Sequence, residues 1–247
     1  MKLLLLFLLL SVSVFAEALT TSVVIPCYYG HVKCLPEVLD CCVHQTVLPD
    51  EVIIALSEVE HVPPEQLSDI EQGNWPFHLK IIKNSGRLSP GENRNIGAEH
   101  AVGDIIVFQD ADDLPHLQRV EIAKHFFETY DIVHLIHCWI PQKEWFSTGV
   151  SFEEYRKEDI AFQRVKSYEE KHISRLVKRY EQANPPWYLH NGNICISRRV
   201  IEEVKYGTGF LGEDVDFNRR VCRHFQRSIV IKANLVIYRN LLSSFRE

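Results

Sequence analysis

One short segment limits the fold of this chain more than any other. In residues 105–113, Ile-Ile-Val-Phe-Gln-Asp-Ala-Asp-Asp, an apolar run leads directly into an acidic cluster. The run does not alternate with polar residues, which indicates a strand buried on both faces. Asp110, Asp112 and Asp113 then follow at the carboxyl end of that strand, where open α/β sheets bind ligands. An acidic turn is more often a solvated loop, but crowded carboxylates after a buried strand favour a site for a hard cation such as Mg²⁺ or Mn²⁺.

Residues 1–18 have the pattern of a signal peptide. Lys2 supplies a positive start, Leu3 to Ala16 are almost entirely apolar, and Ala16-Glu17-Ala18 fits a small-residue cleavage site. The apolar stretch is shorter than the roughly 20 residues that a spanning helix needs, so a cleaved signal is favoured over a signal anchor. We therefore expect a protein of the secretory pathway, in the ER or Golgi lumen or secreted, without a spanning segment after cleavage.

Residues 19–247 suit a single α/β domain that buries its own core. The net charge of −6 and the lack of a Lys/Arg block argue against nucleic-acid binding. The cysteine count of seven leaves at least one thiol without an intramolecular partner even in an oxidising lumen. Cys138 and Cys195 lie in apolar runs, which indicates buried free thiols.

Strand and helix patterns alternate along most of the chain. Such alternation predicts a mostly parallel sheet with helices on both faces. Strands are expected over 20–26, 51–56, 78–83, 105–109, 131–139 and 193–197, with a strand pair near 228–238; helices are expected over 35–45, 63–72, 89–101, 117–130, 198–205 and 213–224. Residues 141–190 break the pattern, being charged with one amphipathic helix that begins near Ile173.

Three further segments carry polar residues beside strand or helix ends. The first strand runs into Pro26-Cys27-Tyr28-Tyr29, a segment that could equally be an ordinary strand exit. Arg94 and Asn95 lie on the helix before the acidic strand, where an arginine can bind a diphosphate through charge-assisted hydrogen bonds. An ordinary arginine on the surface of a helix would give the same sequence pattern. The turn at residues 190–193, His-Asn-Gly-Asn, follows two aromatic residues that would stack on a sugar or pack in the core.

A fourth segment, Gly212-Glu213-Asp214, begins the helix predicted over 213–224. Acidic residues at a helix start often only compensate the helix dipole. Beside a metal site, however, they can supply a general base that deprotonates a hydroxyl.

Four segments of this chain, in their order and spacing, resemble those of family 2 glycosyltransferases of the GT-A fold, a Rossmann-like α/β fold of nucleotide-diphospho-sugar transferases. They are P-C-Y-Y, N-x-G followed by E-N-R-N-I-G-A, F-Q-D-A-D-D, and G-E-D-V-D-F-N-R-R. The resemblance extends from Thr20 to Arg223. It implies a metal-dependent, inverting glycosyltransferase of the hexosyl or N-acetylhexosaminyl type. The Q-x-x-R-W segment of processive members is absent, which favours transfer of a single sugar over polymer synthesis. The donor would be a UDP- or GDP-linked sugar and the acceptor a glycan or protein hydroxyl, with residues 141–190 on the acceptor side.

The resemblance also implies roles for individual residues. Asp110 and Asp112 would hold Mn²⁺ or Mg²⁺ against the donor diphosphate, and Asp113 would support them or act as a further ligand. Asp214 would be the catalytic base, and Glu213 beside it would contact the acceptor or support the base. A third metal ligand cannot be assigned among the four candidate histidines, which are His134, His137, His190 and His224.

The remaining implied contacts concern the donor nucleotide. Arg94 would face the donor phosphates, while Pro26 and Tyr28 would border the base pocket. Many members carry an Asp after the second strand that contacts the nucleobase, whereas this chain has Ser57 and Glu58, which would replace it by hydrogen bonding. This departure leaves the nucleotide open and keeps a second hypothesis in view, a non-catalytic protein of the same fold that binds a nucleotide-sugar or glycan. A phosphotransferase is disfavoured, because its D-x-D motif usually follows the first strand.

Overall fold

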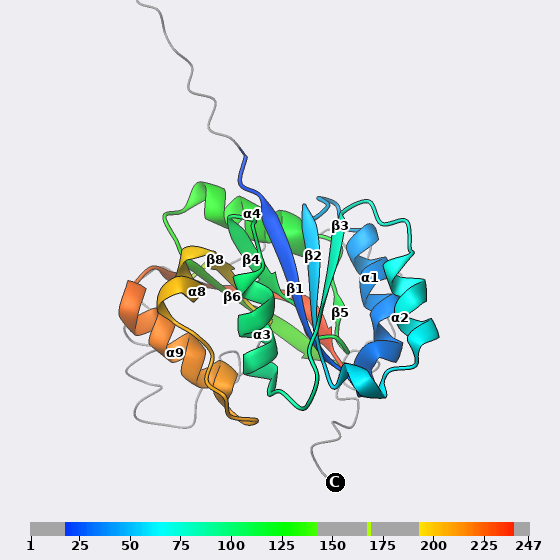
Figure 1. Cartoon of the computed structure of the whole chain (residues 1–247). Coiled ribbons are helices and arrows are strands. Elements are labelled where there is room, and N and C mark those ends of the chain that lie inside the picture. Colours follow the sequence, from blue (N-terminus) through cyan, green and yellow to red (C-terminus); the bar gives the residue numbers. More distant parts are fainter. Residues whose placement is uncertain (1–17, 143–166, 169–192, 240–247) are drawn as a thin grey trace, which may run out of the picture.

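The strands of this protein form one curled sheet with helices on both faces, as the computed structural model shows for residues 18–142, 167–168 and 193–239 (Figure 1). The strands are β1 (Thr21–Tyr28), β2 (Glu51–Ser57), β3 (His78–Lys83), β4 (Ile105–Phe108), β5 (Leu114–Pro115), β6 (His134–Pro141), β7 (Ser167–Tyr168), β8 (Cys195–Ser197) and β9 (Ser228–Tyr238). The helices are α1 (Leu35–Val43), α2 (Pro64–Glu71), α3 (Pro90–Glu99), α4 (Arg119–Thr129), α8 (Arg199–Glu203) and α9 (Glu213–Phe225), with 3-10 turns η1 (Tyr29–Cys34) and η2 (Val59–His61).

The sheet has the order β3-β2-β1-β4-β8-β6-β9-β5, and β7 also pairs with β9. The expected parallel pairing holds from β3 to β4 and between β6 and β9. Strands β8, β5 and β7 run antiparallel to their neighbours. The α/β fold with helices on both faces is therefore confirmed, with a parallel half that places the carboxyl ends of β1, β2 and β4 at one edge.

The strand pair expected near 228–238 is wrong, because these residues form the single strand β9. The pairing of β9 with β6 changes register on either side of Cys138, whose partner is Asn234. These shifts in register allow β9 to continue through the polar residue Asn234 as one strand, without reversing its direction.

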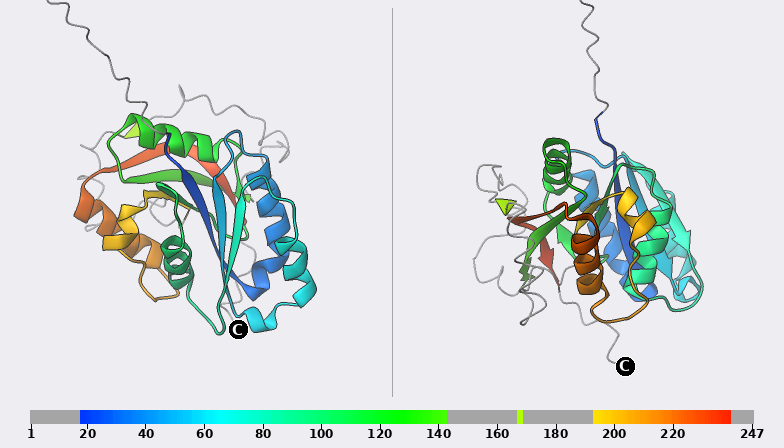
Figure 2. Two further views of the ribbon diagram at one scale, coloured as in Figure 1. Left: turned by 45° about the horizontal axis from the view of Figure 1, so that its top comes forward. Right: turned by 90° about the vertical axis from the view of Figure 1, so that its left-hand side faces the viewer.

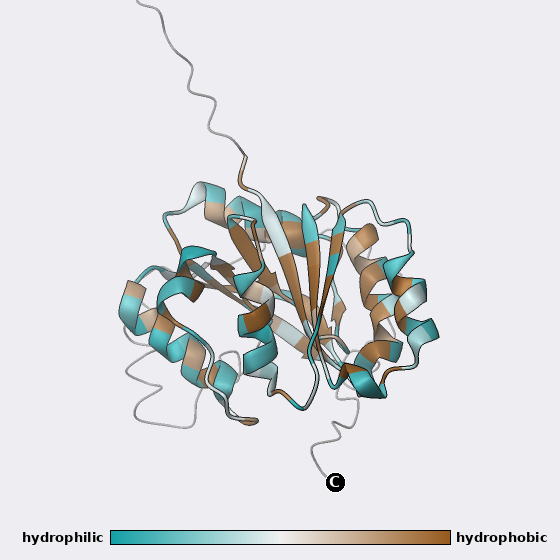
Figure 3. Ribbon diagram, viewed as in Figure 1, coloured by the Kyte–Doolittle hydropathy of each residue, from teal (hydrophilic) through white to brown (hydrophobic). Residues whose placement is uncertain are grey.

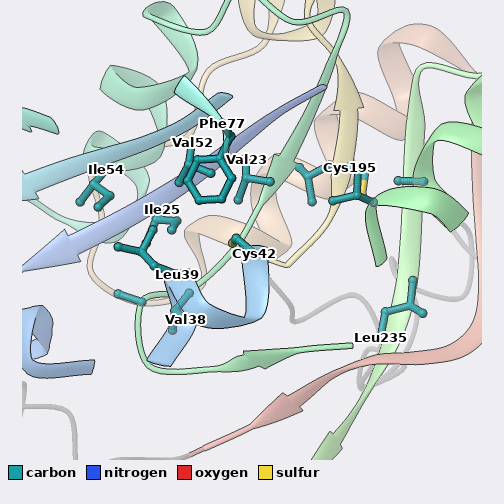
Figure 4. Packing of buried hydrophobic residues seen from close by; sticks show 14 of the residues in the cluster. Val23, Ile25, Val38, Leu39, Cys42, Val52, Ile54, Phe77, Cys195 and Leu235 are labelled. Carbon is teal, nitrogen blue, oxygen red and sulfur yellow. The ribbon is translucent and has the colours of Figure 1, made fainter. Parts of the chain in front are cut away.

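Strand side chains divide between two cores, as period-2 alternation requires. Val23 and Ile25 pack with α1, α2 and α4 on one face, whereas Val24 packs with α3, α8 and α9 on the other. Figure 4 shows the first of these cores, and Figure 2 shows helices flanking the sheet on both sides. Apolar residues are concentrated in the strands and on the inward sides of the helices (Figure 3).

Helix α3 begins where the sequence predicts. Ser89 Oγ accepts a hydrogen bond from the Glu92 amide at 3.2 Å, and the Ser89 amide donates to Glu92 Oε2 at 2.8 Å. This capping box fixes the first turn of the helix that carries Asn93 and Arg94.

All seven cysteines are buried free thiols, as predicted for Cys138 and Cys195. Among the helices of the described segments, none is long and apolar enough to cross a bilayer. The leader, the helix expected near Ile173 and residues 190–192 of the polar turn lie outside the described residues.

Candidate active site

A pocket of about 250 Å³ opens at the sheet edge formed by the carboxyl ends of β1 and β4. Its lining brings together residues that are far apart in the sequence. They are Pro26, Cys27, Tyr28, His31, Leu88, Pro90, Asn93, Arg94, Asp110, Ala111, Asp112, Glu213 and Tyr238. Of the residues expected to bind donor or metal, Pro26, Tyr28, Arg94, Asp110 and Asp112 therefore meet at one pocket.

The acidic turn after β4 is held by hydrogen bonds from two segments that are distant in the sequence. Asn193 accepts a hydrogen bond from the Asp110 amide at 2.9 Å, and its Nδ2 donates to Asp110 Oδ2 at 3.2 Å and to Asp113 Oδ2 at 3.1 Å. Asp113 is fully buried, and its Oδ1 accepts from the Arg239 amide at 2.8 Å. Asp113 thus anchors the turn rather than facing the pocket, which leaves Asp110 and Asp112 on the pocket wall.

Arg94 links the acidic turn to helix α9. Its Nη2 lies 2.7 Å from Asp110 Oδ1, and its Nη1 lies 3.1 Å from Glu213 Oε1. Although burial opposes the charged form, Asp110 and the other surrounding groups raise the pKa of Arg94. The guanidinium that was expected to face donor phosphates is therefore engaged by two carboxylates in this structure.

Asp214 differs from Glu213 in its surroundings. Asp214 Oδ1 accepts a hydrogen bond from the Val215 amide at 2.7 Å, whereas the Glu213 carboxylate is held by Arg94. Burial raises the pKa of Asp214 to about 7, and Glu213 adds to this effect while Arg94 opposes it. A carboxyl group with a pKa near neutrality is suited to general-base catalysis. Glu213 lines the pocket, whereas Asp214 follows it on the first turn of α9 without lining it.

The acidic turn has the chemistry of a site for a hard cation. Burial and the neighbouring Asp110 raise the pKa of Asp112 to about 7, although Arg239 and Arg94 oppose the rise. His31 Nε2 lies 3.7 Å from Asp112 Oδ2, and burial lowers the pKa of His31 to about 4, which keeps its imidazole neutral. Within the described residues, no three side chains of His, Cys, Asp or Glu are grouped to hold a metal ion. Asp110 and Asp112 therefore fit a cation only as a partial set of ligands.

Ser57 and Glu58 do not line the pocket. Ser57 is the last residue of β2 and is fully buried, and its hydroxyl lies 3.4 Å from the Cys27 carbonyl and 3.0 Å from Asn93 Nδ2. Glu58 has a left-handed backbone with φ of 54°, and its amide donates to the Gly86 carbonyl at 2.9 Å. Ser57 and Glu58 were expected to contact the nucleobase, but neither residue lines the pocket. Ser57 instead supports residues that do line the pocket.

The histidines proposed as a third ligand lie elsewhere. His134 is buried between Ser228 and Asn218, and His137 is buried beside the Cys138 carbonyl. His224 is exposed and pairs with Glu203 at 2.6 Å. His190 lies outside the described residues. His31, which the sequence does not single out, lies close to the acidic turn, with its Nε2 3.7 Å from Asp112 Oδ2.

Comparison with known proteins assigns the family. The profile of the family described as Glycosyl transferase family 2 matches residues 22–204. An uncharacterized glycosyltransferase of Bacillus subtilis, YwdF, is 34% identical over 106 residues, which cover 43% of this chain and 38% of that protein. The chain thus spans well under half the length of this relative.

The solved structures show the same fold. Staphylococcus aureus TarS, residues 1–349, has a TM-score of 0.65 at 18% identity, covering 89% of this chain and 60% of that one. The mannosyltransferase PcManGT from Pyrobaculum calidifontis, solved with GDP-Man and Mn²⁺, has a TM-score of 0.61 at 16% identity, covering 89% and 56%. At these identities the likeness shows the fold alone, which is the GT-A fold of glycosyltransferases. Together with the profile match over residues 22–204, it establishes that the chain belongs to glycosyl transferase family 2.

Proposed function

We propose that this protein transfers a single sugar from a nucleoside-diphosphate donor to an acceptor hydroxyl, with inversion at the anomeric carbon and with a divalent cation. The observation that carries the proposal is the bridge from Asp110 through Arg94 to Glu213. This bridge joins the acidic turn, suited to a cation and a diphosphate, to the helix start that bears a carboxyl group with a pKa near 7.

In the proposed reaction, Asp214 accepts the proton of the acceptor hydroxyl as its oxygen attacks the anomeric carbon. Attack from the side opposite the departing nucleoside diphosphate inverts that centre. Glu213 is held by Arg94 and therefore positions the helix start rather than competing as a base. Exchange of partners by Arg94, from Asp110 toward the leaving phosphates, would provide charge-assisted hydrogen bonds to the group that gains negative charge.

Asp110 and Asp112 are the residues that would hold Mn²⁺ or Mg²⁺. A bound cation supplies Lewis-acid stabilisation of the leaving diphosphate. Asp113, Asn193 and the Arg239 amide keep both carboxylates in place through the hydrogen bonds below the turn.

The donor and the location are proposed on separate grounds. Solved relatives of the same fold carry UDP-GlcNAc or GDP-Man, which supports a UDP- or GDP-linked hexose or N-acetylhexosamine. The signal-like residues 1–18 support action in a secretory lumen, where a glycan or protein acceptor is available. Sequencing the N-terminus of the protein purified from its own cells tests the leader, since retention of Lys2 would contradict cleavage.

Calorimetric titration with UDP and GDP, in the presence and absence of Mn²⁺, followed by donor turnover, tests the activity. The proposal predicts Mn²⁺-dependent binding of one nucleotide and release of that nucleotide from its sugar-linked form. Binding without turnover of any donor or acceptor would instead favour the non-catalytic binding protein.

A further inference from the structure

The pocket contains one buried acceptor that the proposed reaction does not use. Asn93 lies on the first turn of α3 and is only 2% exposed, yet it lines the pocket. Its Oδ1 is buried and has no hydrogen-bond partner among the described residues. A buried polar atom without a partner costs free energy, so its presence beside a pocket calls for a ligand that pairs with it.

The neighbours of Asn93 fix which end of its amide is unpaired. Nδ2 lies 3.2 Å from the Cys27 carbonyl and 3.0 Å from Ser57 Oγ. A carbonyl oxygen can only accept, so the amide group must present its NH₂ to Cys27 and its oxygen to the other side. The Ser57 hydroxyl, which donates to the same carbonyl at 3.4 Å, reinforces this orientation. The unpaired atom is therefore a pure acceptor.

The lining around Asn93 differs from the rest of the pocket. Pro26, Cys27, Leu88 and Pro90, from the end of β1 and the start of α3, carry no charge. The charged lining residues are Asp110 and Asp112 of the acidic turn, Glu213 of α9, and Arg94. An uncharged wall with one buried acceptor suits a flat heterocycle, whereas the charged part suits phosphates and a cation.

We propose that Asn93 Oδ1 accepts the ring N–H of the donor nucleobase and so selects uracil or guanine over cytosine and adenine. This inference rests on the proposed function, because it assumes a nucleoside-diphosphate ligand. Uracil N3 and guanine N1 each carry a hydrogen, whereas cytosine N3 and adenine N1 present a lone pair that would face the Asn93 oxygen. Ser57 acts through Asn93 by holding its amide, which gives the residue after β2 a positioning role in place of a direct contact.

Titration with paired nucleotides tests this assignment without requiring turnover. UDP and CDP form one matched pair and GDP and ADP the other, each measured with Mn²⁺ against the wild-type protein and Asn93→Leu. For one pair, the wild-type protein is expected to bind the N–H-bearing nucleotide at least about 10-fold more tightly, since a site built around a hydrogen bond rejects ligands that cannot form it. In Asn93→Leu that ratio falls to near 1. Inorganic pyrophosphate, which has no base, is expected to bind both proteins equally.

Asn95→Leu is the matched control, because it makes the same change two residues further along α3. Asn95 Nδ2 donates to the Tyr206 carbonyl at 3.0 Å, its Oδ1 accepts from the Tyr206 amide at 2.8 Å, and the residue does not line the pocket. This variant should keep the wild-type nucleotide preference.

The outcomes separate this inference from the function on which it rests. If the wild-type protein binds no nucleoside diphosphate, both fall. If it binds UDP and CDP alike and GDP and ADP alike, or if Asn93→Leu keeps the preference, the function stands and the role of Asn93 is wrong. Loss of pyrophosphate binding in Asn93→Leu would likewise overturn the assignment, because Asn93 would then support the whole pocket rather than the base.

Discussion

Arg94 Nη2 lies 2.7 Å from Asp110 Oδ1, and this contact joins the helix before the acidic strand to the turn after it. The same guanidinium reaches Glu213, and all three side chains are largely shielded from water. A buried cation shared by two carboxylates has consequences for stability as well as for catalysis.

Replacing Arg94 by Met should lower the free energy of unfolding by about 3 kcal/mol, because two shielded carboxylates lose their partner. Urea denaturation measures the change. Arg227→Met is the matched control, since it breaks an exposed pair with Asp131 at 2.8 Å and should cost less than about 1 kcal/mol. Equal costs for the two variants would contradict a buried bridge at the site.

The rate of sugar transfer should depend on the ionisation of Asp214. A base must be deprotonated to accept a proton, and burial raises the pKa of Asp214 to about 7. We therefore expect kcat/KM to rise with pH up to about 7 and then level off. Asp214→Asn should lose this dependence and at least about 100-fold in rate.

Asp216→Asn provides the control for that profile. Asp216 lies on the same first turn of α9 but is half-exposed and pairs with Arg220 at 2.7 Å. It should keep the wild-type profile. If Asp216→Asn altered the pH profile of kcat/KM and Asp214→Asn did not, Asp214 would not be the catalytic base.

Asp214 should also make stability depend on pH. The pKa of Asp214 is raised in the folded protein, so folding favours its protonated form. The resulting contribution to the free energy of unfolding is fully present below the ordinary Asp pKa near 4. This contribution is lost as pH rises through about 7. Asp214→Asn should therefore gain stability relative to the wild type between pH 4 and 7, with a constant difference above that. Parallel urea midpoints across this range would show that the carboxyl is not perturbed.

The start of α3 offers a test of how the sequence positions Asn93 and Arg94. Ser89→Ala removes the acceptor of the Glu92 amide and should cost about 1 kcal/mol. Ser68→Ala, inside α2, removes a hydroxyl that only accepts from the exposed Gln72 side chain and should cost less. Thermal unfolding of both variants gives the comparison. An equal effect would mean that the cap contributes nothing to α3.

Local patterns predicted much of the fold and the acidic turn. The unbroken apolar run before Asp110 reflects burial on both faces of β4, and that burial places the turn at the carboxyl edge of the sheet. The Ser89 cap is equally local. These features depend on short stretches of sequence, which is why they could be read directly.

The contacts between distant segments could not be predicted in this way. Asn193 and Arg239 support the acidic turn from 80 or more residues away, and no spacing signal links them to it. The apolar pattern of the second strand ends at Leu56 and so predicts a turn at Ser57, whereas β2 continues through Ser57. Asn93 resembles any polar residue on a surface helix, since only the fold shows that its amide faces the Cys27 carbonyl.

The most direct test of the account is nucleotide release from a panel of UDP- and GDP-sugars by the wild-type protein and by Asp112→Asn, with and without Mn²⁺. Hydrolysis of the donor needs no acceptor, so the measurement does not depend on knowing one. We expect Mn²⁺-dependent release from one donor class by the wild-type protein and none above background by a folded Asp112→Asn. Release that is independent of Mn²⁺ and unchanged in Asp112→Asn would contradict it.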